Sequence, residues 1–417
     1  MISGRVEPTK KKKKNTVREP PSMFSSLPDE IVENILARVS RWKYPSLSLV
    51  SKRFHTLLSS IEIYKTRSQI GASETCSYVL LKLPDHPSAS WFSLRPKPNS
   101  QNRTKRWFSL ETKPNNQNRT KRRGKIKFKR DSCGFSVVPI PSPSTDSFPE
   151  LCRIKTVGSD IYIIGGPYEE PSSSVRIFDC RSHTSRDAPN MTVARESALS
   201  ALLDEKIYVM GGCDIDKYNA NWIEVFDLKT QSWTSLPGPG ADDEELRNHL
   251  GEHNYYYIVY VFEGKLYLEA DAKEYSYEPK NGAWKLVRDM SSAISDSIDV
   301  SCEIGNLKYG CTVSGNLMWS GFENKGIEWR EIKGLEELQG LKTGTDFGLV
   351  GCGGQLLVMW DPYTVSPFKR SNKIRYAEIS LESRRNGREM WGKVECVDVL
   401  TFPVESYEWF DCVAASV

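Results

Sequence analysis

Apolar residues recur at two different spacings along this chain. In the N-terminal part, Ile31 is followed by further apolar residues four, five and eight positions later, which is the spacing of one face of a helix. Beyond residue 70 the apolar residues come in short runs bounded by glycine, proline or polar residues, which is typical of strands. The pattern predicts a small all-α N-terminal module followed by a larger all-β body.

The signals for a helix start are clear at Pro28. A proline suits the first helical turn, where its missing N–H has no intrahelical partner, and Asp29 and Glu30 complement the positive helix N-terminus. We expect Pro45 to open a second short helix that carries Leu47, Leu49 and Val50, and a third helix to follow around Phe54. A module of about forty residues buries only a small core, so part of its apolar surface should be left for a partner.

A turn followed by an apolar strand recurs five times in the later part of the chain. The five strands begin at Ile161, Ile207, Leu266, Leu317 and Leu356, so the steps between them are 46, 59, 51 and 39 residues. Repeats of about fifty residues are typical of propeller blades, which are small antiparallel sheets that become stable by stacking around an axis. The sequence therefore predicts a propeller with five visible repeats.

Glycine pairs and spaced tryptophans mark these repeats. A glycine pair at a strand end indicates a sharp turn or a close backbone approach that a side chain would obstruct. The residues expected to shape the blades are Gly165, Gly166, Gly211, Gly212, Trp233, Trp284 and Trp329. The first repeat has Ser185 where tryptophan is expected, and the third has Leu268–Ala270 in place of the glycine pair, so the blade count stays open.

The two ends of the β region could form a sixth blade. Ser77–Leu83 reads SYVLLKL and is followed by a WFSL segment, and we expect both to pair with strands around Val394–Leu400 and Trp409–Ala414. Joining the chain ends in this way would close the ring and remove exposed sheet edges.

A sixteen-residue segment occurs twice in tandem. Trp91–Arg106 and Trp107–Arg122 differ at three positions, and only one WFSL can occupy a given strand, so the other copy should lie in a loop. The predicted organisation is a disordered basic tail (1–22), a helical module (23–70), first strands with the duplicated basic loop (71–130, with copies 91–106 and 107–122) and a propeller (131–417).

Charge is unevenly distributed, although the net charge is only +4. Arg95–Arg130 holds fourteen Lys and Arg and one acid, Glu111, so this stretch carries +13 and the remainder carries −9. Such a stretch can bind phosphate groups of nucleic acid or lipid, but we favour a tolerated surface insertion and do not expect a nucleic-acid partner. The N-terminal lysines match a nuclear import signal as well as a solvated run of charge. They are Lys10, Lys11, Lys12, Lys13 and Lys14.

No segment carries a clear catalytic pattern. No apolar run approaches the length of a membrane span and no signal peptide is evident, so we expect an intracellular protein of the nucleus or cytoplasm, away from membranes, with its cysteines as thiols. His249–His253 reads HLGEH and matches an inverted zinc-protease pattern, but Gly251 inside it and the strand-like sequence after it indicate a loop. We expect no metal, no cofactor and no enzymatic activity.

The helical module resembles an F-box in Leu27-Pro28, Ile31, Leu36 and the segment LSLVSKRF from Leu47 to Phe54. The glycine pairs with spaced aromatic residues resemble kelch repeats, and the arrangement is similar to the plant F-box/kelch-repeat protein family. In that family the F-box binds a Skp-family adaptor, which links it to a cullin in an SCF-type ubiquitin ligase, and the propeller binds a target protein. The resemblance implies adaptor contacts, or their immediate support, at Leu27, Pro28, Ile31, Leu36, Leu47, Val50 and Phe54.

Two other functions remain compatible with the sequence. The chain could be a propeller enzyme or small-molecule binder with a non-functional F-box, or a nuclear nucleic-acid-binding protein that uses its basic stretches. The sequence does not identify the target protein, because target choice depends on loops that carry no readable code.

Overall fold

The computed structural model describes residues 26–84, 89–97, 134–140, 153–166, 170–239, 244, 258–270, 273–289, 298–323, 326–362 and 370–417. The chain divides into two units, residues 1–72 and residues 73–417. The predicted tail (1–22, with Lys10–Lys14), the second repeat copy (107–122) and His249–His253 lie outside the described residues.

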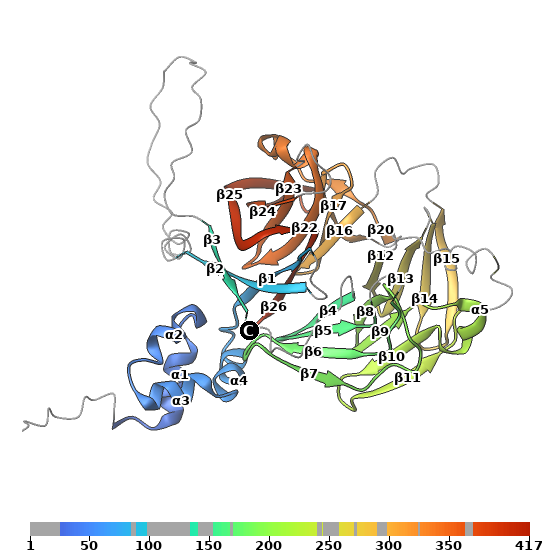
Figure 1. Cartoon of the computed structure of the whole chain (residues 1–417). Coiled ribbons are helices and arrows are strands. Elements are labelled where there is room, and N and C mark those ends of the chain that lie inside the picture. Colours follow the sequence, from blue (N-terminus) through green and yellow to red (C-terminus); the bar gives the residue numbers. More distant parts are fainter. Residues whose placement is uncertain are drawn as a thin grey trace, which may run out of the picture. The chain divides into compact units, whose positions relative to one another are not determined.

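The first unit is helical throughout its regular structure (Figure 1). Its elements are α1 (Asp29–Ala37), the 3-10 helix η2 (Arg41–Lys43), α2 (Tyr44–Leu47), α3 (Lys52–Ser59) and α4 (Glu62–Gln69). Helix α1 begins directly after Pro28, as predicted. Helix α2 ends at Leu47, so Leu49 and Val50 lie in the turn that follows it and not in the predicted second helix. Ser51 caps α3 by accepting a hydrogen bond from the Phe54 backbone N–H at 3.1 Å.

A small core and one buried arginine hold these helices together. The core consists of Val32, Leu36, Ala37, Tyr44, Leu58 and Ile63. Arg67 of α4 is 1% exposed and donates hydrogen bonds to the carbonyl oxygens of Ala37 at 3.0 Å, Val39 at 2.6 Å and Ala72 at 2.6 Å. Because the last carbonyls of a helix have no intrahelical partner, Arg67 satisfies the end of α1 and ties it to α4.

The second unit is a six-bladed propeller (Figure 1). Each blade contains one four-stranded antiparallel sheet within the described residues. We number blades 1 to 5 after the five sequence repeats and call the sixth the closing blade. Blade 1 holds β4 (Arg153–Val157), β5 (Asp160–Ile164), β6 (Val175–Asp179) and β7 (Thr184–Ala188); blade 2 holds β8 (Leu199–Leu203), β9 (Lys206–Met210), β10 (Ile223–Asp227) and β11 (Ser232–Leu236).

Blades 3 to 5 continue in the same order. Blade 3 holds β12 (Ile258–Phe262), β13 (Lys265–Ala270), β14 (Lys273–Glu278) and β15 (Ala283–Asp289). Blade 4 holds β16 (Ile298–Ile304), β17 (Leu307–Thr312), β18 (Leu317–Ser320) and β21 (Arg330–Glu331). Blade 5 holds β22 (Gly344–Cys352), β23 (Gln355–Pro362), β24 (Arg370–Arg384) and β25 (Glu389–Tyr407). The minor elements are α5 (Ile215–Tyr218), η5 (Asn219–Asn221), β19 (Phe322–Glu323), β20 (Gly326–Ile327) and η6 (Glu336–Thr343).

The closing blade joins the C-terminal strand to the first three strands of the unit. Its order is β26 (Trp409–Ser416), β1 (Thr75–Lys82), β2 (Ala89–Pro96) and β3 (Phe135–Pro139). Figure 1 shows the red β26 beside the blue β1. Strand β26 also neighbours β22 and β4, the first strands of blades 5 and 1, so it completes the inner ring. The predicted joining of Ser77–Leu83 to Trp409–Ala414 is confirmed.

Two strand placements in the sequence analysis are wrong. Val394–Leu400 belongs to β25 and pairs with β24 in blade 5, and β3 takes the fourth position of the closing blade. The strand that begins at Leu317 is the third of blade 4, because β17 from Leu307 is the counterpart of the second strands of the other blades. Both segments have the local pattern of a strand, and only their pairing, which involves distant residues, assigns their place.

The first WFSL copy forms β2, in which Trp91, Phe92 and Leu94 are buried. None of the described helices is long and apolar enough to cross a membrane. Seven described cysteines are free, but Cys396 in β25 is disulfide-bonded, contrary to the expectation that all ten are thiols. Spacing along the chain does not reveal such a pairing, because it depends on which segments the fold brings together.

Candidate functional site

The helical unit exposes a group of large apolar side chains. Ile31 is 48% exposed and Ile35 is 40% exposed on α1, and Leu49 and Val50 after α2 are 86% and 66% exposed. Exposed apolar side chains gathered on so small a unit indicate a protein-binding surface, because their burial by a partner is favourable.

The seven residues predicted for adaptor binding include exposed, half-buried and buried side chains. Pro28, Ile31 and Val50 are exposed, and Leu27, Leu47 and Phe54 are half-buried against the core. Leu36 is 3% exposed, so it can only support the surface from inside. The sequence analysis did not name Ile35 and Leu49 as site residues, although the apolar spacing from Ile31 includes Ile35 and the expected second helix carried Leu49.

An ion pair positions the start of α1 against α3. Arg53 contacts the Asp29 carboxylate with Nε–Oδ1 at 2.6 Å, and its guanidinium also donates a hydrogen bond to the carbonyl oxygen of Leu27. The two contacts hold the Leu27-Pro28 segment on α3, which places Pro28 at a defined position on the surface of the unit.

On the propeller, the two glycine pairs lie at the ends of β5 and β9. A Cβ atom on Gly165 would lie 2.9 Å from the Arg195 carbonyl oxygen, and one on Gly212 would collide with the carbonyl oxygen of Glu196. Gly165, Gly211 and Gly212 adopt φ angles of +77°, +69° and +68°, which favour glycine. A Cβ on Gly166 would also collide with the carbonyl oxygen of Glu170, while Gly165 and Gly212 both leave room for the Arg195–Glu196 segment that joins blade 1 to blade 2.

The three predicted tryptophans lie at the outer strands of their blades. Trp233 packs on Phe226 and Trp284 packs on Tyr277, in both cases with ring centroids 5.0 Å apart. Trp329 directly precedes β21. The indole of Trp233 also donates a hydrogen bond to the carbonyl oxygen of Pro189 at 2.7 Å, which links blade 2 to the segment after blade 1.

The missing tryptophan of blade 1 is replaced from a neighbouring blade. Ser185 lies opposite Phe178, in the register that Trp233 and Trp284 occupy in their blades. The Trp91 ring of the closing blade covers Phe178 instead, with centroids 4.9 Å apart, and the half-buried His183 stacks on the same ring. The seam between the closing blade and blade 1 is therefore aromatic.

A buried ion pair joins blades 1 and 2, and no sequence motif identified it. Arg195 and Glu224 have fully buried side chains, with Nη2 and Oε2 2.9 Å apart. Arg195 also donates hydrogen bonds to the carbonyl oxygens of Gly211 at 2.6 Å and Trp222 at 3.0 Å, while Glu224 accepts from the Thr192 backbone N–H at 2.7 Å. The only sequence signal was the carboxylate of Glu224 inside the apolar strand β10.

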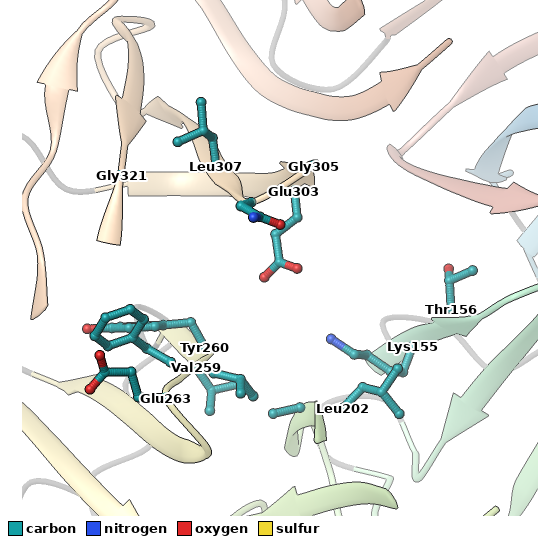
Figure 2. A pocket seen from close by; sticks show the side chains of 14 residues that line it. Lys155, Thr156, Leu202, Val259, Tyr260, Glu263, Glu303, Gly305, Leu307 and Gly321 are labelled. Atoms are coloured by element: carbon teal, nitrogen blue, oxygen red, sulfur yellow. The ribbon is translucent and has the colours of Figure 1, made fainter. Parts of the chain in front are cut away.

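A cavity of about 790 Å³ lies in the inner ring between blades 1 to 4. Lys155, Thr156, Leu202, Val259, Tyr260, Glu263, Glu303 and Leu307 are among the residues that line it. Figure 2 shows the Lys155 ammonium from β4 and the Glu303 carboxylate from β16 pointing into the same open space. We refer to this space as the channel cavity.

Burial lowers the pKa values of two lysines of the propeller, Lys155 at the channel cavity and Lys308 in β17. It lowers the pKa of Lys155, against the opposing effect of the Glu303 carboxylate. It lowers the pKa of Lys308 to about 8, although Glu303 and Glu269 favour the charged form. Lys308 is 4% exposed, and its ammonium lies 4.7 Å from the centroid of the Tyr260 ring, so it joins blade 4 to blade 3.

We expect Lys308 to contribute a rise of about 1 kcal/mol to the free energy of unfolding between pH 8 and pH 9. Lys308 has a folded pKa of about 8 against an ordinary value of 10.5, so in this interval the unfolded chain binds more protons and rising pH favours the folded state. Buried thiols oppose this contribution from about pH 8 upward, because the pKa of Cys302 is raised from 9.0 to about 12 and the unfolded thiol releases its proton first. Urea denaturation at pH 7, 8 and 9 measures the change.

Lys308→Met is the variant that tests this assignment. Relative to the wild type, it should make the change in the free energy of unfolding between pH 8 and pH 9 less positive by about 1 kcal/mol. It should also increase the free energy of unfolding at pH 7 by about 1 to 3 kcal/mol, because it removes a buried charge. Lys285→Met, on the exposed face of β15, should keep the wild-type pH profile. A wild-type pH profile in Lys308→Met would show that Lys308 does not make this contribution.

The sequence has clear relatives among known proteins. The F-box domain family matches residues 24–66, and the family described as FKB95, Kelch-repeats domain, matches residues 107–401. An F-box/kelch-repeat protein of Arabidopsis thaliana is 42% identical to this chain and the match covers 100% of this chain and 98% of that protein. Two further F-box/kelch-repeat proteins of the same plant are each 37% identical, with coverage of 98% and 98% in one case and 94% and 93% in the other.

Proposed function

The chain belongs to the F-box/kelch-repeat family of plant proteins, which have the domain arrangement of substrate adaptors, and on that premise we propose that it recruits a target protein to an SCF-type cullin ubiquitin ligase. The F-box would bind a Skp-family adaptor, and the propeller would bind the target. The protein would accelerate ubiquitin transfer by proximity, since it raises the local concentration of the target near the activated ubiquitin and forms no bond itself.

The observation that carries this proposal is the exposure of Ile31, Ile35, Leu49 and Val50 on a folded helical unit. The core of the unit is complete without them, and Arg67 and Arg53 fix the helices that present them. These apolar side chains can contact a partner without any unfolding of the unit. The free energy of binding is therefore not reduced by a cost of rearranging the helices.

We propose the loops at the propeller ends as the target-binding region. Several of these turns hold non-glycine residues at positive φ, among them Asp204, Glu205 and Glu263, so their backbone geometry is well defined by type I′-like turns. The lining of the channel cavity also carries the carboxylates of Glu263 and Glu303. These carboxylates favour a target with basic or dipolar groups.

Ile31→Asp should weaken binding to a Skp-family adaptor about 10- to 100-fold, because an apolar contact worth about 1.5 to 3 kcal/mol is lost and a carboxylate is buried in its place. The double variant Leu27→Ala with Pro28→Ala should act in the same direction. Binding is measured by titration of purified full-length protein with the purified adaptor, and by mass spectrometry of proteins captured from plant extract.

Ser59→Asp provides the matched control, since Ser59 is exposed at the end of α3 and belongs to no part of the apolar group. This variant should bind the adaptor like the wild type, and the melting curves of Ile31→Asp and Ser59→Asp should overlay that of the wild type. Wild-type affinity of Ile31→Asp for the adaptor would refute the assignment of this surface. Absence of any adaptor and cullin from wild-type captures would refute the ligase proposal itself.

A further inference from the structure

We propose that the channel cavity binds a small zwitterion of the amino-acid type, with its carboxylate at Lys155 and its ammonium group at Glu303. This inference concerns the inner ring of the propeller alone. It does not depend on the adaptor function of the helical unit.

The first argument is that two opposite charges face one cavity without being paired. Within the described part of the chain, the side chains of Lys155 and Glu303 have neither a hydrogen-bond partner nor an ion-pair partner. Burial lowers the pKa of Lys155, and the Glu303 carboxylate opposes that shift by favouring the charged form of the lysine. Lys155 is half-buried and Glu303 is exposed, so both groups are accessible, and a ligand with one group of each sign would pair with both at once.

The second argument is the balance of charge around the cavity. Its lining contains the ammonium of Lys155 and the carboxylates of Glu263 and Glu303, and the ammonium of Lys308 contacts the ring of the lining residue Tyr260. A simple anion at Lys155 would approach Glu303 and leave it unpaired, and a simple cation at Glu303 would be repelled by Lys155. A dipolar ligand without net charge avoids both penalties.

The third argument is the size and apolar character of the remaining surface. The cavity volume of about 790 Å³ lies within the range of small-molecule sites, about 300 to 1,000 Å³. Leu202, Val261 and Leu307 line it together with the charged groups. The ligand should therefore be an amino acid with an apolar or aromatic side chain, and not one with a second charge.

The test uses purified full-length protein and free leucine, isoleucine, valine, methionine, phenylalanine and tryptophan as probes. At least one should raise the Tm by about 3 °C at a concentration far above its Kd, because a ligand that binds only the folded state stabilises it by mass action. Isothermal titration calorimetry then gives the Kd. The N-acetyl derivative of the best ligand, which lacks the ammonium group, and its amide, which lacks the carboxylate, should each bind at least 10-fold more weakly.

Lys155→Met and Glu303→Gln should each weaken binding of the best ligand at least 10-fold, since each keeps the approximate shape of the side chain and removes one charge. Lys285→Met and Glu331→Gln make the same changes on exposed residues of the outer strands β15 and β21 and should bind like the wild type. The proposal is overturned if none of the six amino acids shifts the Tm, or if both cavity variants retain wild-type affinity. Equal binding of the N-acetyl derivative would also overturn it and would indicate a site for a lone carboxylate such as a peptide C-terminus.

Discussion

Removal of the last nine residues, Trp409–Val417, should abolish the cooperative unfolding transition of the propeller. These residues form β26, which pairs with β1 over eight residues, from Thr75 opposite Ser416 to Lys82 opposite Trp409. In this segment Phe410, Ala415 and Val417 are buried. Without it the inner ring is open, and β1 presents an unpaired apolar edge that promotes aggregation. Circular dichroism melts and size-exclusion chromatography of the truncated chain measure the loss.

A chain in which β26 is moved to precede β1 tests whether the propeller requires the strand itself or its position at the C-terminus. Val417 and Glu74 exchange backbone hydrogen bonds at 2.9 Å and 2.7 Å, so the end of β26 lies beside the start of β1. The nine residues can therefore be inserted between Ser73 and Glu74, followed by an Asn-Gly turn, to form a hairpin with β1. This chain should recover the cooperative transition. If the simple truncation melts like the wild type, β26 does not close the propeller.

Glu224→Ala should lower the free energy of unfolding by about 3 to 5 kcal/mol, because it leaves the fully buried Arg195 guanidinium without its carboxylate. The change also leaves the Thr192 backbone N–H without its acceptor. Arg195→Met should have an effect of similar size, since it strands the Glu224 carboxylate and removes the donor to Gly211 and Trp222. Urea denaturation of the full chain measures both variants.

The double variant Arg195→Met with Glu224→Leu should be less destabilised than the sum of the single variants, because no charge is then left buried alone. Lys229→Met removes a lysine from an exposed ion pair with Glu205 in the same blade and should leave the unfolding transition unchanged. Strict additivity of the two single effects would show that the ion pair does not couple blades 1 and 2.

The sequence identified most of the elements that local patterns define. The helix after Pro28, the strands after the glycine-bearing turns and the pairing of the two chain ends all follow from periodicity, turn residues and the need to cover sheet edges. The errors concern pairing between distant segments. Leu317 and Val394–Leu400 both lie in strands, but the sequence analysis gave each the wrong neighbours.

Periodicity also failed to separate buried from exposed residues of the helical unit. Ile31 and Leu36 both belong to the apolar pattern, yet Leu36 is buried and Ile31 is 48% exposed. The stripe of apolar residues on α1 is wider than the area that α3 and α4 cover, and that area depends on how the helices pack. The difference matters for function, because only the exposed residues can contact a partner.

The amino-acid sequence alone determined the two kinds of unit, the repeat that builds the propeller and the family to which the chain belongs, since each depends on residues close together in the chain. Only the tertiary structure decided which groups meet across blades: Arg195 with Glu224, Trp91 with Phe178, and Lys155 facing Glu303. Residues of separate blades are brought together by the closing of the ring, a long-range event that spacing along the chain does not encode. The buried pair and the channel cavity are therefore properties of the folded propeller, and no single repeat contains either of them.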